Sequence, residues 1–170
     1  MNDIRKLEPL DVGAILRQLA DASTRPRYAF LVLKLISEVA DAAGRAGPMI
    51  VAGDRALLLR DWLSDALSPL ARGQRRAALR RRVAAGLAAS LPQNPQHAEA
   101  ILAAAVDARV RASSKANVSR AVGDLMRAGL VRRHYAGWRT DHPNRGGRRS
   151  AVYTVEAEAL AAMRRRSLLF

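Results

Sequence analysis

The sequence predicts a mainly α-helical protein with a small β-wing near its C-terminus. Three observations predict this fold class. Apolar residues recur at helical spacing over most of the chain, β-branched and aromatic residues gather in a short segment at 150–155, and glycine and proline mark the breaks between segments. The length of 170 residues and the hydrophobic fraction of 49% are ordinary for a globular chain that buries a core. We therefore expect a helical N-terminal layer followed by a smaller module that contains the strands.

Two helices are expected first. Asp11 is suited to cap a helix that runs to about Asp21. Pro26 fits the first turn of a second helix, whose apolar positions follow the i, i+3, i+4, i+7 pattern. This apolar stripe consists of Tyr28, Leu31, Val32, Leu35, Ile36 and Val39. Gly44 and the Gly47-Pro48 pair end the segment, and residues 49–51 are either a short strand or a connector.

Three further helices are expected before residue 110. The third starts near Asp54 and runs to Leu67, with Leu58, Trp62 and Leu63 in the core. The fourth covers about 74–90, and the fifth begins near Gln96. Residues 1–92 are thus predicted to be a helical region for packing and dimerisation, and residues 93–170 a second domain.

The positive charge is concentrated in the second part of the chain. The formal net charge is +14, and residues 1–70 contribute nothing to it because their nine basic and nine acidic groups balance. Residues 71–170 carry 20 basic and 6 acidic groups, which indicates a polyanionic partner. The fourth helix carries a second basic cluster of Arg75, Arg76, Arg80, Arg81 and Arg82, in which Arg75, Arg76 and Arg80 are candidate phosphate contacts. The alternatives for this helix are an arginine-rich RNA-binding surface or a solvated face.

Several classes of protein are excluded on composition. The chain has no cysteine, and its three histidines (His97, His134, His142) have no metal-ligand spacing, so we expect neither a disulfide framework nor a metal site. No phosphate-loop, dinucleotide-binding or serine-nucleophile motif occurs, and we expect neither a cofactor nor an enzyme. No apolar run reaches the ~20 residues that a membrane span needs, and the N-terminus is unlike a signal peptide. A cytoplasmic, nucleoid-associated protein is expected.

The segment from residue 113 to 133 has the features of a recognition helix. Ser113 or Ser114 is suited to cap it, and Gly129 to end it. Val118, Ala121, Val122 and Leu125 are spaced to be buried. The exposed N-terminal side carries Lys115, Asn117, Ser119 and Arg120, a small, polar and cationic set that can hydrogen-bond base edges in a major groove. Upstream, residues 107–115 fit the end of a first helix and a tight turn.

The residues that follow fit a wing. Residues 130–138 are expected to form a strand, residues 150–155 its returning partner, and residues 156–166 a short helix. The loop between the strands carries Arg139, Arg145, Arg148 and Arg149, which we expect against phosphates or in a minor groove. Helix, turn, helix, strand, basic loop and strand is the order of a winged helix-turn-helix.

Residues 107–163 resemble the winged helix of bacterial regulators of the multiple-antibiotic-resistance regulator (MarR) type. The resemblance lies in three phrases: Ser-Lys-Ala-Asn-Val-Ser-Arg-Ala-Val at 114–122, Leu-Met-Arg-Ala-Gly-Leu-Val-Arg-Arg at 125–133, and the stretch at 147–160 that begins Gly-Arg-Arg-Ser. It implies that Ser114, Lys115, Asn117, Ser119 and Arg120 face bases and phosphates. It also implies that Arg148 and Arg149 lie on the wing.

The sequence therefore predicts a sequence-specific transcriptional regulator that binds double-stranded DNA, with a recognition helix at about 114–128 in the major groove. A homodimer is expected, because two copies read a palindromic site. The alternative is a non-specific architectural, nucleoid or replication-associated protein, which the arginines outside the recognition helix favour. RNA binding is a third interpretation.

Overall fold

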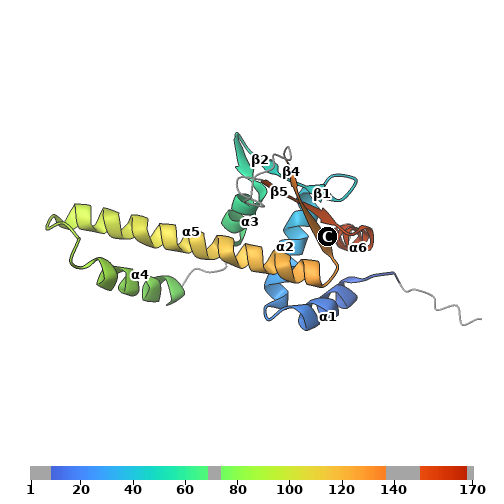
Figure 1. Cartoon of the computed structure of the whole chain (residues 1–170), viewed down its shortest axis with the longest axis horizontal. Helices are drawn as coiled ribbons and strands as arrows, with labels where there is room; N and C mark the ends of the chain where they lie inside the picture. The colour runs from blue at the N-terminus through green and yellow to red at the C-terminus, as the bar shows by residue number, and fades with distance from the viewer. Residues whose placement is uncertain (1–8, 69–73, 137–149, 168–170) are drawn as a thin grey trace, which may run out of the picture. The chain divides into compact units, whose positions relative to one another are not determined.

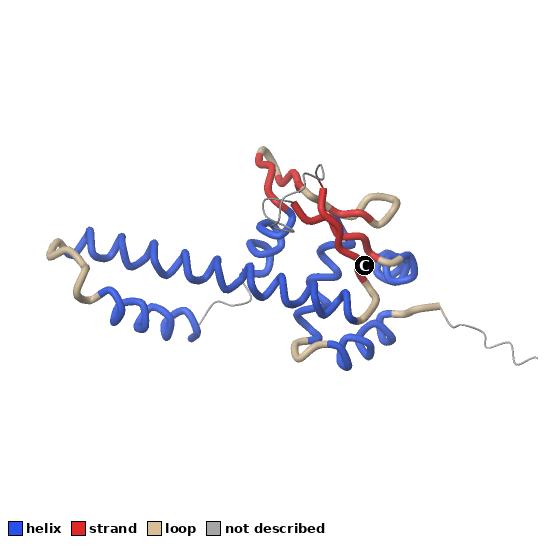
Figure 2. Tube along the Cα trace, in the orientation of Figure 1, coloured by secondary structure: helices blue, strands red, loops and turns tan. Residues whose placement is uncertain are grey.

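The computed structural model describes residues 9–68, 74–136 and 150–167 (Figure 1). Within these residues the protein is mainly helical, with a small amount of antiparallel sheet, as the sequence predicts. The helices are α1 (Val12–Ala22), α2 (Pro26–Val39), α3 (Leu59–Leu67), α4 (Gln74–Leu87), α5 (Pro95–Arg127) and α6 (Ala157–Ser167). The strands, drawn in red in Figure 2, are β1 (Arg45–Ala46), β2 (Met49–Ala52), β3 (Arg55–Leu58), β4 (Val131–Ala136) and β5 (Ser150–Val155).

The chain divides into two compact units. The first unit consists of residues 1–59 together with 119–170, and the second of residues 60–118. The predicted boundary between residues 92 and 93 falls inside the second unit, between α4 and α5. The first two helices and β1 thus share a unit with β4, β5 and α6, which lie far later in the sequence.

The first unit is built around a three-stranded antiparallel sheet in the order β1-β5-β4. β1 pairs with β5 at Ala46↔Tyr153, and β4 pairs with β5 from Val131↔Val155 to Ala136↔Ser150. The helices α2 and α6 contact one another, and α2 also packs on β5. The core of this unit includes Ile15, Leu19, Val32, Leu33, Ile36, Val152 and Val155.

The first two helices begin and end close to the predicted positions. The Asp11 carboxylate accepts a hydrogen bond from the Ala14 N–H (2.6 Å), so it caps α1 as predicted, and Pro26 occupies the first turn of α2. Val32 and Ile36 are buried as predicted, but Leu33 is buried in place of Leu31 and Leu35. The buried face is rotated because α2 packs against α1, α6 and the sheet at once.

The expected third helix starts later than predicted. Residues 55–58 form β3, which pairs with β2 in a hairpin, so α3 begins at Leu59 and not near Asp54. Gly53 (φ +65°) and Asp54 form the two-residue turn, whose backbone suits glycine. Leu63 is fully buried as predicted, but Leu58 is 40% exposed and Trp62 only half-buried, so the predicted core places of these two are wrong. Residues 49–51 lie in a strand and are not a connector.

The predicted turn before the recognition helix does not exist. α5 is one uninterrupted helix of 33 residues, and it joins the expected fifth helix to the expected recognition helix. Ser113 and Ser114 lie inside it and do not cap a helix start. The physical reason is local: residues 97–122 contain neither proline nor glycine, and alanine, the best helix former, recurs throughout. Asn94 caps the helix instead, accepting hydrogen bonds from the Gln96 and His97 N–H groups.

Candidate nucleic-acid interface

The C-terminal part of α5 has the buried stripe that its sequence predicts. Val118, Val122 and Leu125 are fully buried, and Ala121 nearly so. The helix ends where predicted: Gly129 has φ +70°, and the Leu130 N–H donates to the Leu125 carbonyl (2.9 Å). This closing bond is typical of a helix that stops at a left-handed glycine. The chain then continues through two buried residues into β4.

Small residues and arginines occupy exposed positions of α5. In the first unit these are Ser119 and Arg120, and in the second unit Arg109, Ser113 and Ala116. Side chains as small as serine and alanine let a helix backbone approach a groove closely, while arginine reaches base edges and phosphates. Of the predicted recognition residues, Ser119 and Arg120 are exposed.

Two other predicted recognition residues face α3. The Ser114 hydroxyl donates to the Ser64 carbonyl (3.0 Å), and the Lys115 ammonium pairs with the Asp61 carboxylate (2.8 Å). Asn117 is half-buried. Ser114 and Lys115 therefore hold α3 against α5. The sequence does not predict these contacts, because their partners precede them by about fifty residues.

The C-terminal end of α5 is anchored to the junction of α1 and α2. The Asp124 carboxylate accepts a hydrogen bond from the Ser23 hydroxyl (2.5 Å) and pairs with Arg127. The Arg127 guanidinium also donates to the Ala22 carbonyl (3.2 Å). These contacts fix the helix end that leads into β4. Neither Asp124 nor Ser23 can be assigned this role from the sequence, because a lone carboxylate on a helix gives no signal of it.

Strand β4 presents four consecutive exposed residues, Arg132, Arg133, His134 and Tyr135. Arg133 lies over the Tyr135 ring, with 5.5 Å from guanidinium carbon to ring centroid, and Arg132 pairs with Glu156 (2.6 Å). β4 forms an edge of its sheet. It leads into residues 137–149, so the predicted wing residues Arg139, Arg145, Arg148 and Arg149 lie outside the described residues.

Two of the three predicted phosphate contacts on α4 are paired with carboxylates. Arg76 pairs with Asp107 and Arg80 with Glu99, each at 2.5 Å, so α4 lies beside the first half of α5, as Figure 1 shows. The hydrogen bond from Arg80 holds the pKa of Glu99 below its ordinary value. Arg75 lies in α4, but its side chain is outside the described part of the structure.

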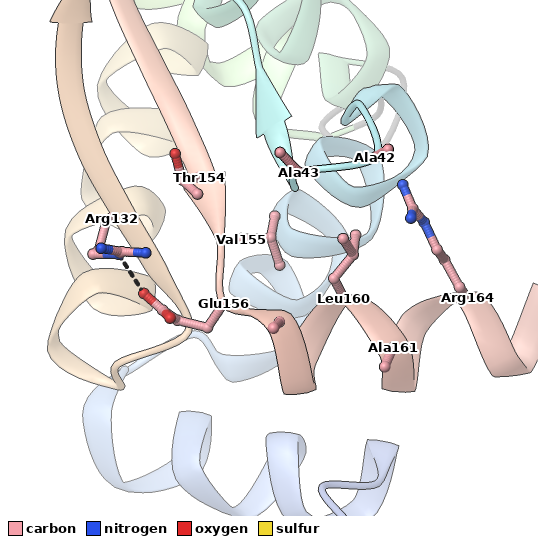
Figure 3. A pocket seen from close by; sticks show the side chains of 10 residues that line it. Ala42, Ala43, Arg132, Thr154, Val155, Glu156, Leu160, Ala161 and Arg164 are labelled. Carbon is pink, nitrogen blue, oxygen red and sulfur yellow. Dashed lines mark ion pairs between the residues drawn. The ribbon is translucent and has the colours of Figure 1, made fainter.

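A shallow cavity of about 470 Å³ lies between the loop after α2 and the start of α6 (Figure 3). Its charged lining residues are Arg132, Glu156 and Arg164. Arg164 donates to the Ala40 and Asp41 carbonyls (3.2 and 3.0 Å), and Arg132 to Glu156, so these polar groups satisfy one another. Among the residues with a described position, no three histidine, aspartate or glutamate side chains gather as metal ligands, and no helix has the length and apolar character to cross a membrane.

Comparisons of the chain with protein-family models, with curated proteins and with solved structures return no match.

Proposed function

We propose that the chain is a winged helix-turn-helix protein that binds double-stranded DNA and regulates transcription. The observation that carries this proposal is the connectivity of the sheet. β1 follows a helix, α5 leads into β4, β4 and β5 are separated in the sequence by a stretch rich in arginine, and the strand order is β1-β5-β4. A winged helix has this arrangement: the first strand pairs with the third, and the second strand, which leads out of the recognition helix, forms the edge.

The proposal assigns the first helix of the helix-turn-helix to α3. α3 is held against α5 by the Ser114 and Lys115 contacts, in the way that the first helix of such a motif supports the second. The usual short turn between the two is then replaced by an insertion that contains α4 and the first half of α5. The resemblance of residues 107–163 to MarR-type regulators supports the recognition helix and the wing, but it does not extend to α3.

On this assignment, the DNA-reading surface is the exposed side of α5 at Ser119 and Arg120. Arg133 on β4 and the arginines of residues 139–149 supply phosphate contacts. Ser114 and Lys115 position the helix and do not read bases.

Replacing Arg120 by alanine should cost about 1–3 kcal/mol of discrimination between the cognate duplex and a scrambled one, because a bidentate arginine–guanine contact is lost. The measurement is fluorescence anisotropy on both duplexes, with the DNA upstream of the coding sequence as the first cognate candidate. Arg17→Ala, which replaces an exposed arginine on α1, is the matched control and should leave discrimination unchanged. Equal weakening on both duplexes would mean that Arg120 contacts only phosphate.

Replacing Arg148 and Arg149 together by alanine should weaken binding to every duplex and lower the slope of log K against log salt by about 1.8, since each phosphate contact contributes about 0.9. A titration from low to physiological salt measures this slope. If the slope of the double variant equals that of the wild type, these two arginines do not contact DNA.

A non-specific architectural protein is the second candidate. The exposed arginines of residues 60–118 that pair with no described carboxylate favour it. Wild-type binding decides between the two candidates. A preference of roughly a thousandfold for one duplex over its scramble supports a regulator, whereas equal binding supports the architectural role. A regulator of this kind is expected to bind as a homodimer, which sedimentation of the complex measures.

A further inference from the structure

The second unit, residues 60–118, has a surplus of positive charge. Its sequence holds ten basic and four acidic residues. Three of the four acidic side chains are already used within the unit: Asp61 by Lys115, Glu99 by Arg80 and Asp107 by Arg76. Three of the four carboxylates in this unit are thus already paired with cations. Only the carboxylate of Asp65 remains to balance the other basic side chains.

These remaining cations can be named. Within the described part of this unit, five arginines are exposed and form no ion pair with an acidic side chain: Arg60, Arg81, Arg82, Arg109 and Arg111. Three adjacent arginines of α4 differ in their pairing. Arg80 pairs with Glu99, whereas Arg81 and Arg82 pair with no described carboxylate.

The two ion pairs fix which side of α4 faces α5. Arg76 and Arg80 are one turn apart, and Val83 and Leu87, both half-buried, continue the same side at helical spacing. A second set of positions, also at helical spacing, lies on the far side and is exposed. It consists of Ala78, Arg81, Arg82 and Ala85, which we call the outer face of α4.

We propose that the outer face of α4 is a second, sequence-independent DNA contact, which binds the phosphate backbone of the duplex. The inference rests on the proposed function, to which it adds an insertion that extends the DNA contact beyond the helix-turn-helix. Arginine presents a planar fork of donors that matches phosphate oxygens, and the flanking alanines leave the approach open.

The chemistry of this face argues against a protein partner. It carries no large apolar or aromatic side chain that would anchor a protein interface. A second copy of the chain would bring the same positive charges to the same place, and like charges disfavour that contact. Phosphate has the required sign and geometry, and among the described residues no carboxylate must first be displaced from Arg81 or Arg82.

The test compares two double variants that each remove two positive charges. Arg81→Ala/Arg82→Ala removes the outer face, and Arg17→Ala/Arg27→Ala removes two exposed arginines from α1 and α2 in the other unit. Alanine favours helix, so both variants should keep the wild-type circular dichroism spectrum. Each is titrated by anisotropy against a duplex of about 40 base pairs, long enough to exceed a single helix-turn-helix site, over a range of salt concentrations.

The outer-face variant should lower the salt slope by about 1.8 and weaken binding by about tenfold at ~0.15 M salt, with equal effects on cognate and scrambled duplexes. The control variant should change the slope by less than half as much. Equal slopes for the two variants would mean that only net charge matters, and an unchanged slope for the outer-face variant would remove α4 from the interface; either result overturns the inference. Tighter wild-type binding to a matched RNA duplex, lost in the outer-face variant, would overturn the assignment to DNA.

Failure of this inference is distinguishable from failure of the proposed function. Suppose that the wild type binds DNA, that Arg120→Ala loses discrimination, and that the outer-face variant keeps the wild-type salt slope. The proposed function is then supported, and only the contact of α4 with DNA is ruled out. If the wild type binds no duplex at all, the proposed function itself is wrong.

Discussion

Replacing Ala112 by proline is expected to destabilise the protein by about 3 kcal/mol or more. Ala112 lies in the interior of α5, which runs unbroken from Pro95 to Arg127. Proline at this position removes the hydrogen bond from the residue 112 N–H to the Ala108 carbonyl, and its ring clashes with that carbonyl. Urea denaturation followed by circular dichroism measures the loss, which should appear together with a decrease in helical signal.

Ala112→Gly is the control for this experiment. Glycine keeps the N–H and the hydrogen bond, so it should cost only about 1 kcal/mol. Were residue 112 in a turn between two separate helices, as the sequence predicts, proline would be tolerated nearly as well as glycine. A proline variant within about 0.5 kcal/mol of the glycine variant would therefore contradict a continuous α5.

Replacing Gly44 by alanine is expected to destabilise the protein by roughly 2–4 kcal/mol, for two reasons that add together. Gly44 has φ +78°, which a residue with a Cβ atom rarely adopts, and an added Cβ would lie 2.7 Å from the Val155 carbonyl oxygen. That oxygen belongs to the backbone and cannot move alone. The Gly44 carbonyl also accepts the Val155 N–H (2.8 Å), so a shift would strain the junction of β1 with β5. Thermal or urea denaturation measures the effect.

Gly53→Ala is the matched control for Gly44. Gly53 also has a positive φ (+65°), but nothing lies within 4 Å of an added Cβ. Its loss of stability reports the backbone conformation alone, about 1–2 kcal/mol. If Gly44→Ala is no less stable than Gly53→Ala, the backbone at Val155 moves away from the new Cβ without loss of stability, which contradicts the prediction.

The turn before β1 strengthens the expectation for Gly44. The Asp41 carboxylate accepts hydrogen bonds from the Ala43 and Arg45 N–H groups, both at 2.9 Å. The hydrogen bond from the Arg45 backbone holds the pKa of Asp41 below its ordinary value. The residues around Gly44 are thus held in place on both sides, which leaves little freedom to absorb a new methyl group.

The elements that sequence alone predicts well are those whose signals are local. Asp11 and Pro26 mark helix starts within a few residues of themselves, and Gly129 marks a helix end. The returning strand predicted at residues 150–155 is β5, and α6 begins one residue later than expected. The buried stripe from Val118 to Leu125 follows from periodicity alone, since a helix that packs on one side needs it.

The elements that sequence alone misses depend on distant partners. β1 has only two residues and pairs with a strand more than 100 residues later, so it has no signal of its own. Ser113 and Ser114 suit a helix cap better than a helix interior, and the hydrogen bond from Ser114 to the distant Ser64 carbonyl is a contact that the local sequence does not reveal. Lys115 is likewise predicted as a base contact, but its pairing with Asp61, which the sequence does not reveal, makes it a residue that positions α5.

The first unit is assembled from two segments that are far apart in the sequence, because residues 60–118 separate them. Its central strand, β5, supplies the backbone partners of both β1 and β4. During synthesis α1, α2 and β1 therefore leave the ribosome long before the strand that completes their sheet, and the side of α2 that packs on β5 and α6 stays uncovered in that interval. Residues 60–118 are continuous in the sequence, so their contacts with one another do not depend on residues that are synthesised later. The inserted unit can therefore form before the unit that contains the N-terminal helices closes, although those helices are synthesised first.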